Sequence, residues 1–127
     1  MEHRNDRSVK GVWWKKLTDC QGSVTHYRKY CGTFKIGMTN NLNERGKQYD
    51  TYSLHGRPLR MYELYGTERY LSACQMEDSL IEYARMICPE KCRNKKKARP
   101  GRPTNRKAPY YWVYFVCTKP SDTPVRP

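Results

Sequence analysis

The sequence has no long apolar run and few acidic residues. None of its 127 residues belongs to a run of the eighteen or so apolar residues that a membrane span needs, and Met1 to Ser8 contains no apolar signal-peptide core. Only 12 Asp and Glu stand against 25 Lys and Arg, so the formal net charge is +13. We therefore expect an intracellular protein, nuclear in a eukaryotic host, with no membrane partner. The charge favours nucleic acid as its partner.

Phenylalanine is also scarce, with two residues against eleven Tyr and three Trp. Aromatic side chains with polar tips suit stacking on bases and hydrogen bonding to phosphates, and they suit half-buried sheets equally well. The aromatic composition is therefore compatible with nucleic-acid binding but does not require it.

Cysteine occurs six times without a secretory signal, so we expect reduced thiols. Cys88 and Cys92 have a C-x-x-x-C spacing that suits half of a zinc site, and Cys20, Cys31 and His26 are alternatives for the rest. Free or buried thiols are the alternative to zinc.

Periodicity and chain breakers predict one α+β domain, a small antiparallel sheet of three or more strands flanked by helices. Strands are expected at 11–17, 32–38, 59–65 and 109–117, with a long hairpin connection over 18–29 and an alternative extra strand at 24–30. Helices are expected at 41–49, capped by Asn41 with Glu44 three residues on, and at 71–88, stopped by Pro89. The expected organisation is a mobile basic arm (1–10), the main part of the domain (11–90), a basic loop (91–108), the final strand of the same domain (109–118) and a tail (119–127).

Glu77 lies on the apolar stripe of the predicted helix 71–88. Ala73 precedes it by one turn, and Leu80 and Ala84 follow on the same face. A carboxylate there must lose water, at a cost of several kcal/mol that a cation, a metal or hydrogen-bond donors must offset. Glu77 is therefore a candidate metal ligand, and a salt-bridged residue at the edge of the stripe is the alternative.

Two cations precede Glu77 in the chain. Lys35 lies in the predicted strand 32–38 between the apolar Phe34 and Ile36, so it points to the opposite face. Arg45 lies near the start of the helix 41–49, where a bound phosphate would meet it.

These positions form a pattern. Residues 34–45, Phe-Lys-Ile-Gly-Met-Thr-Asn-Asn-Leu-Asn-Glu-Arg, resemble the second half of the GIY-YIG nuclease signature in its phage-type form, K-I-G-x-T-x-N-x-x-x-R. Residues 73–81, Ala-Cys-Gln-Met-Glu-Asp-Ser-Leu-Ile, resemble the later helix of that superfamily, A-x-x-x-E-x-x-L-I. Residues 11–13, Gly-Val-Trp, are similar to the G-I-Y of the first half. The last strand, 109–117, is similar to a final aromatic strand of the same branch.

The resemblance implies a metal-dependent DNA endonuclease that hydrolyses phosphodiester bonds. Glu77 would hold Mg²⁺ or Mn²⁺ and Arg45 would grip the scissile phosphate. Lys35 would add to that grip or help to activate the attacking water.

Trp13 takes the position of the first-motif Tyr, and an indole cannot act as a base. Three phenols are alternatives for this role: Tyr27, Tyr30, and Tyr114 if the last strand pairs beside strand 32–38. If none reaches the site, the chain is a catalytically inactive DNA-binding protein on the same scaffold. A zinc-stabilised nucleic-acid-binding module is a further alternative.

The run 91–107 is basic and carries no large apolar side chain. Its Arg-Pro-Gly-Arg-Pro core, residues 99–103, resembles an AT-hook, whose extended Gly-Arg-Pro suits the narrow minor groove of A·T-rich DNA. The predicted DNA-binding residues are Lys95, Lys96, Lys97, Arg99, Arg102, Arg106 and Lys107. The expected partner is therefore DNA, with branched and A·T-rich forms as alternatives.

Overall fold

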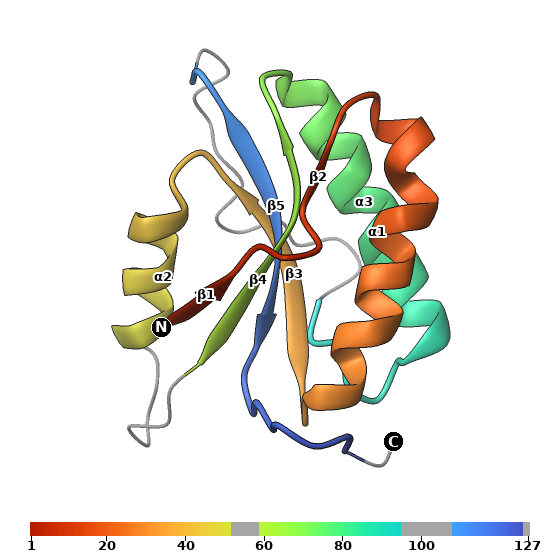
Figure 1. Cartoon of the computed structure of the whole chain (residues 1–127), viewed down its shortest axis with the longest axis vertical. Helices are drawn as coiled ribbons and strands as arrows, with labels where there is room; N and C mark the ends of the chain where they lie inside the picture. The colour runs from red at the N-terminus through yellow and green to blue at the C-terminus, as the bar shows by residue number, and fades with distance from the viewer. Residues whose placement is uncertain (52–58, 95–107, 126–127) are drawn as a thin grey trace.

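The computed structural model describes residues 1–51, 59–94 and 108–125. Over this part of the chain the protein is α+β, a five-stranded mixed sheet flanked by three helices (Figure 1). The strands are β1 (Glu2–Arg4), β2 (Val9–Lys10), β3 (Phe34–Thr39), β4 (Arg60–Thr67) and β5 (Tyr111–Cys117). The helices are α1 (Trp13–Tyr27), α2 (Leu42–Thr51) and α3 (Tyr70–Ile87), and a short 3₁₀ turn, Arg28–Tyr30, follows α1.

The sheet has its last strand in the middle. β5 pairs antiparallel with β3 on one side and with β4 on the other, as Figure 1 shows. β1 and β2 both pair with β4, in parallel, along its other side. The predicted strands 32–38, 59–65 and 109–117 are confirmed. The sheet is mixed rather than antiparallel throughout, because the N-terminal residues add two short parallel strands.

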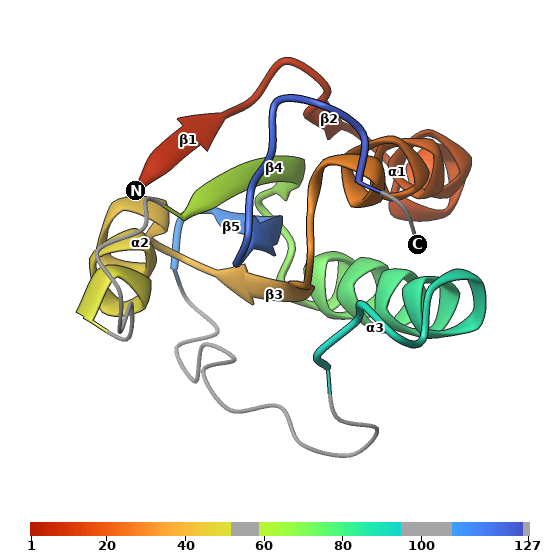
Figure 2. The same ribbon diagram turned by 90° about the horizontal axis from the view of Figure 1, so that it is seen from below.

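The helices lie on both faces of the sheet. α1 and α3 lie side by side against one face, and α2 lies at the other (Figure 2). The larger buried cluster joins α1 and α3 to alternate residues of β3 and β5, among them Phe34, Ile36 and Phe115. A smaller cluster of Met61, Tyr114 and Val116 faces α2. Among the described helices, none combines the length and apolar character that a membrane span requires.

The expectation of a mobile arm at residues 1–10 is wrong. The N-terminal amine contacts the Asp50 carboxylate at 3.1 Å, and Arg60 donates to the Glu2 carboxylate at 3.0 Å. Gly46 of α2 is buried, and a Cβ there would lie 2.9 Å from the His3 imidazole. The first residues pack closely on α2 because this position carries no side chain.

The expected strand 11–17 and hairpin 18–29 are also wrong, as is the alternative strand at 24–30, because residues 13–27 form a helix. Trp13, Leu17, Cys20, Val24 and Tyr27 recur at steps of three or four and pack on the core. Burial of this stripe against α3 and the sheet outweighs the weak helix propensity of the Thr, Asp, Ser and Gly residues between them.

The expected reduced state is wrong for two cysteines, because Cys31 and Cys117 form a disulfide with Cα atoms 5.6 Å apart. It joins the end of the 3₁₀ turn to the end of β5. The predicted tail also packs against this turn, since Ser121 donates its amide to the Tyr30 carbonyl at 2.8 Å. Residues 119–125 therefore belong to the folded domain.

Candidate functional site

The centre of the candidate site is Tyr114, which β5 places opposite Gly37 of β3. Tyr114 is 2 % exposed, and its ring lies directly over Gly37. A Cβ at position 37 would be 2.3 Å from the phenol oxygen, so only glycine leaves room for the ring there. The condition for Tyr114 to reach the site, that the last strand pairs beside strand 32–38, is met.

Helix α2 brings a second phenol and a guanidinium to this face. Asn41 caps the helix as predicted, accepting from the Glu44 amide at 3.0 Å. Tyr49 lies four residues after Arg45, on the same side of the helix. The hydroxyls of Tyr49 and Tyr114 are hydrogen-bonded at 2.9 Å, and their rings meet edge to face.

Helix α3 supplies the carboxylate. Glu77 is 5 % exposed and lies on the apolar stripe, as predicted. The Cys74 thiol, one turn before it, contacts the Met38 sulfur at 3.8 Å, so this side of the helix faces β3. Glu77 therefore lies on the α3 side of β3, whereas Tyr114 lies on the α2 face. β3 is the terminal strand of the sheet, so only this strand lies between the two sides at the site.

The electrostatics tie these groups together. Burial raises the pKa of Tyr114 well above its usual value, Tyr49 and the Glu77 carboxylate raise it further, and the Arg45 guanidinium opposes the shift. Burial also raises the pKa of Tyr49, with Arg45 opposing and Glu77 reinforcing that shift. Both phenols therefore keep their protons at neutral pH, and Arg45 and Glu77 act on both of them.

These raised pKa values predict alkaline instability. Burial also raises the pKa values of Tyr65 and Tyr27, and it raises that of Cys20 to about 12. The folded chain then retains protons that the unfolded chain releases, so stability is full below about pH 9 and is lost as pH rises through the folded pKa values. We expect Tm to fall steeply above about pH 10. The Tyr114→Phe variant should show a shallower decline, and a flat Tm to about pH 12 in the wild type would contradict this reading of the phenols.

Lys35 lies on the face predicted for it. Its neighbours Phe34 and Ile36 are buried against the helices α1 and α3, whereas Lys35 is half-buried opposite Val116 on the α2 face. It thus shares a face with Tyr114, two residues along β3 from Gly37.

The outer side of β3 is covered by the residues that follow α3. The Asn94 side chain accepts from the Ile36 amide at 2.8 Å and donates to the Ile36 carbonyl at 2.7 Å. The Lys91 carbonyl accepts from the Phe34 amide at 2.9 Å. These bonds hold β3, and with it Lys35 and Gly37, in place.

The other two candidate phenols lie elsewhere. Tyr27 stacks on Tyr62 with ring centroids 3.7 Å apart and contacts Phe115, on the face opposite to Tyr114. Tyr30 follows α1 and packs beside His26. The structure therefore brings one of the three candidates, Tyr114, to Arg45 and Glu77.

Residues 11–13 do not form the strand that a match to the first motif requires. Gly11 forms a turn with φ +119°, Val12 caps α1 and Trp13 begins it, so no strand forms there. The strand beside β3 is β5, which presents Trp112-Val113-Tyr114. A phenol thus lies at the place where residues 11–13 were expected to put an indole.

The cysteines do not assemble as a zinc site would require. Cys31 is bonded to Cys117, and the Cys20 thiol donates to the Leu64 carbonyl at 3.6 Å. Across the described ranges, no three His, Cys, Asp or Glu side chains gather closely enough to hold a metal ion. The predicted DNA-binding residues of the run 95–107 lie outside the described residues.

The donor set around Glu77 fits a hard divalent cation better than zinc. Mg²⁺ takes one or two carboxylates, retains several waters and completes its shell with substrate phosphates, so it needs no cage of protein ligands. A single buried carboxylate whose charge acts on two phenols matches that requirement.

Comparisons with protein-family models, with curated proteins and with solved structures gave no significant match. We therefore infer the candidate site from its geometry alone. Tyr49 is the member that the sequence reasoning missed. Its spacing of four residues from Arg45, which puts both side chains on one side of a helix, was the available signal.

Proposed function

We propose that the protein is a metal-dependent DNA endonuclease of the GIY-YIG type. The observation that carries the proposal is the Tyr114–Tyr49 hydrogen bond over Gly37, with Arg45 and Glu77 acting on both phenols. A guanidinium and a carboxylate that both act on a pair of hydrogen-bonded phenols are groups that can support phosphodiester hydrolysis with a water nucleophile.

Each residue has a role in this proposal. Arg45 binds the scissile phosphate through paired hydrogen bonds, and Lys35 adds a second positive charge on the same face. Glu77 holds Mg²⁺ or Mn²⁺, which when bound would offset the charge of the carboxylate, screen the phosphate and lower the pKa of the phenols. Tyr114 orients the attacking water.

The phenol pair gives the proton of that water a path outward. Tyr114 is buried and Tyr49 is half-buried, and their hydroxyls are in direct contact at 2.9 Å. As the water oxygen bonds to phosphorus and the bond from phosphorus to the leaving oxygen breaks, Tyr114 accepts the water proton and passes its own hydroxyl proton to Tyr49. Tyr49, which lies nearer to solvent, releases its own hydroxyl proton to solvent in the same relay, so both phenols end as they began.

The raised pKa of both phenols favours a second candidate. A phenol that holds its proton firmly is a donor at neutral pH and a poor base. Without a cation to lower these pKa values, the same cluster binds a phosphate and does not cleave it. This second candidate is a catalytically inactive DNA-binding protein.

Metal dependence separates the two candidates. We expect purified protein to nick supercoiled DNA and to cut branched DNA in Mg²⁺ or Mn²⁺, and to leave both intact in the presence of a chelator. Electrophoresis of the products measures this. If wild-type protein binds DNA tightly and cuts it with neither metal, the nuclease is excluded and the inactive binding protein stands.

A further inference from the structure

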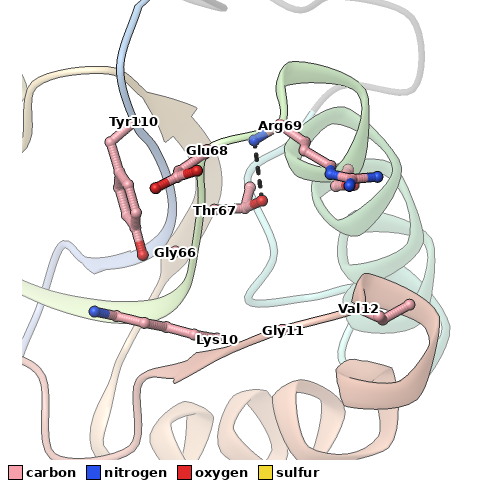
Figure 3. A pocket seen from close by; sticks show the side chains of 9 residues that line it. Lys10, Gly11, Val12, Gly66, Thr67, Glu68, Arg69 and Tyr110 are labelled. Carbon is pink, nitrogen blue, oxygen red and sulfur yellow. Dashed lines mark hydrogen bonds between the residues drawn. The ribbon is translucent and has the colours of Figure 1, made fainter.

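A groove of about 510 Å³ opens where β2 turns into α1 and β4 turns into α3 (Figure 3). We call it the aromatic groove and define it by Lys10, Gly11, Gly66, Arg69 and Tyr110. Its size is within the range of small-ligand sites. Gly11 contributes no side chain, so a ligand can approach the backbone of the turn between β2 and α1.

The Tyr110 ring forms one wall of the groove, and Trp112 supports that ring without lining the groove itself. Tyr110 packs against Trp112 with ring centroids 4.8 Å apart, and a Cβ at Gly66 would lie 2.7 Å from the Tyr110 hydroxyl. Gly66 therefore lets the Tyr110 ring lie close to the strand. Tyr110 and Trp112 are both half-buried, so part of each ring is accessible.

The groove also carries positive charge. The Lys10 ammonium lies 5.8 Å from the centre of the Tyr110 ring, and Figure 3 shows its side chain extending toward that residue. Arg69 lies on the opposite side, and Glu68 is the one acidic residue among those that line the groove. The Tyr110 ring, with the Lys10 ammonium beside it, suits a base that stacks while its phosphates meet Lys10 and, across the groove, Arg69.

The groove is close to the Tyr114 cluster. Trp112 and Tyr114 alternate along β5 and share the face that α2 covers, and Tyr110 comes four residues before Tyr114. Four extended residues span at most about 14 Å. A DNA strand that has one phosphate at Arg45 and Tyr114 can therefore place a nearby nucleotide against Tyr110.

We propose that the aromatic groove binds an unpaired nucleotide of the nucleic acid beside the cleavage site. Its link to cleavage rests on the proposed function, whereas base binding does not. In a duplex both faces of each base are stacked, so no base face is available to Tyr110. An unpaired base offers its face without that cost. The protein should therefore prefer single-stranded or branched DNA to a continuous duplex.

The test measures binding in a chelator, so cleavage plays no part in it. A labelled single-stranded oligonucleotide and the duplex of the same sequence are titrated with wild-type, Tyr110→Ala and Tyr110→Phe proteins. Loss of the ring should weaken single-strand binding about tenfold and duplex binding less than about twofold. Tyr110→Phe keeps the ring and should stay within about twofold of wild type on both ligands.

A matched pair tests the charge. Lys10→Gln and Lys15→Gln each remove one cation, but Lys15 lies over Trp14 on α1, outside the groove. Lys10→Gln should weaken single-strand binding several times more than Lys15→Gln does.

The possible outcomes distinguish the two proposals. Equal effects of Tyr110→Ala on both ligands, or no effect on either, would overturn the groove proposal even if wild-type protein cuts DNA. Selective loss of single-strand binding would support the groove even if wild-type protein cuts nothing. Thermal unfolding of Tyr110→Ala confirms that any loss is measured on folded protein.

Discussion

Glu77→Gln should abolish metal-dependent cleavage while leaving DNA binding unchanged. Gln has nearly the volume of Glu, so the packing of α3 on β3 is retained, but a neutral amide is a weak ligand for a hard cation. A metal that stabilises charge in the transition state contributes several kcal/mol, and each 1.4 kcal/mol is a factor of ten in rate. We expect the cleavage rate to fall at least about a thousandfold.

Glu82→Gln is the matched control, because Glu82 lies on the same helix but is exposed. It should cleave at the wild-type rate. Nicking assays in Mg²⁺ and in Mn²⁺ measure the rate, and binding titrations in a chelator measure affinity. An equal loss of binding and cleavage in Glu77→Gln, or an equal effect of the two substitutions, would show that Glu77 is not a metal ligand.

Gly37→Ala should damage both the fold and the site. The new Cβ would overlap the Tyr114 ring, at 2.3 Å from the hydroxyl oxygen and 2.5 Å from the carbon that bears it. The ring must move, and with it the hydrogen bond to Tyr49. We expect the free energy of unfolding to fall by about 1–3 kcal/mol, as for other overpacked cores. Cleavage should fall about a hundredfold, since small misplacements of reacting groups have effects of that size.

Gly22→Ala is the matched control, since a Cβ there meets no atom within 4 Å. Gly22 lies inside α1, so alanine should stabilise the protein by about 0.5–1 kcal/mol without changing cleavage. A double variant sharpens the test: Tyr114→Ala removes the overlapping ring, so Gly37→Ala should cost less stability in that background. Urea unfolding of wild type, Gly37→Ala, Tyr114→Ala and the double variant measures this difference. Additive losses of stability in the double variant would contradict the overlap between the Cβ and the ring.

Much of the fold could be predicted from local sequence. The strand at 111–117 is a run of aromatic and β-branched residues, and the strands at 34–39 and 60–67 mix apolar with charged residues. α3 has an apolar stripe with helical spacing. α1 was mistaken for a strand because its first residues, Val12, Trp13 and Trp14, favour strands locally. The apolar stripe of α1 favours a helix only because it is buried against α3 and the sheet. β1 has three exposed residues and no alternation, so it gives no local signal.

The candidate site divides in the same way. Arg45 and Glu77 lie on helices with clear local patterns, so their positions could be predicted from the sequence. The position of Tyr114 depends on the order of strands in the sheet, which is set by pairings between residues far apart in the chain. Local sequence gives no such information, so it does not distinguish Tyr114 from Tyr27 and Tyr30.

The central place of β5 also sets the order in which the molecule can be built. During synthesis, residues 34–39 and 60–67 emerge long before residues 111–117, which join them. Until then β3 and β4 have no strand between them, and no Tyr114 ring covers Gly37. The nascent chain therefore exposes unpaired strand edges until residues 111–117 emerge, a state that invites aggregation. Arg45, Glu77 and the two phenols of the candidate site come together only after residues 111–117 have left the ribosome.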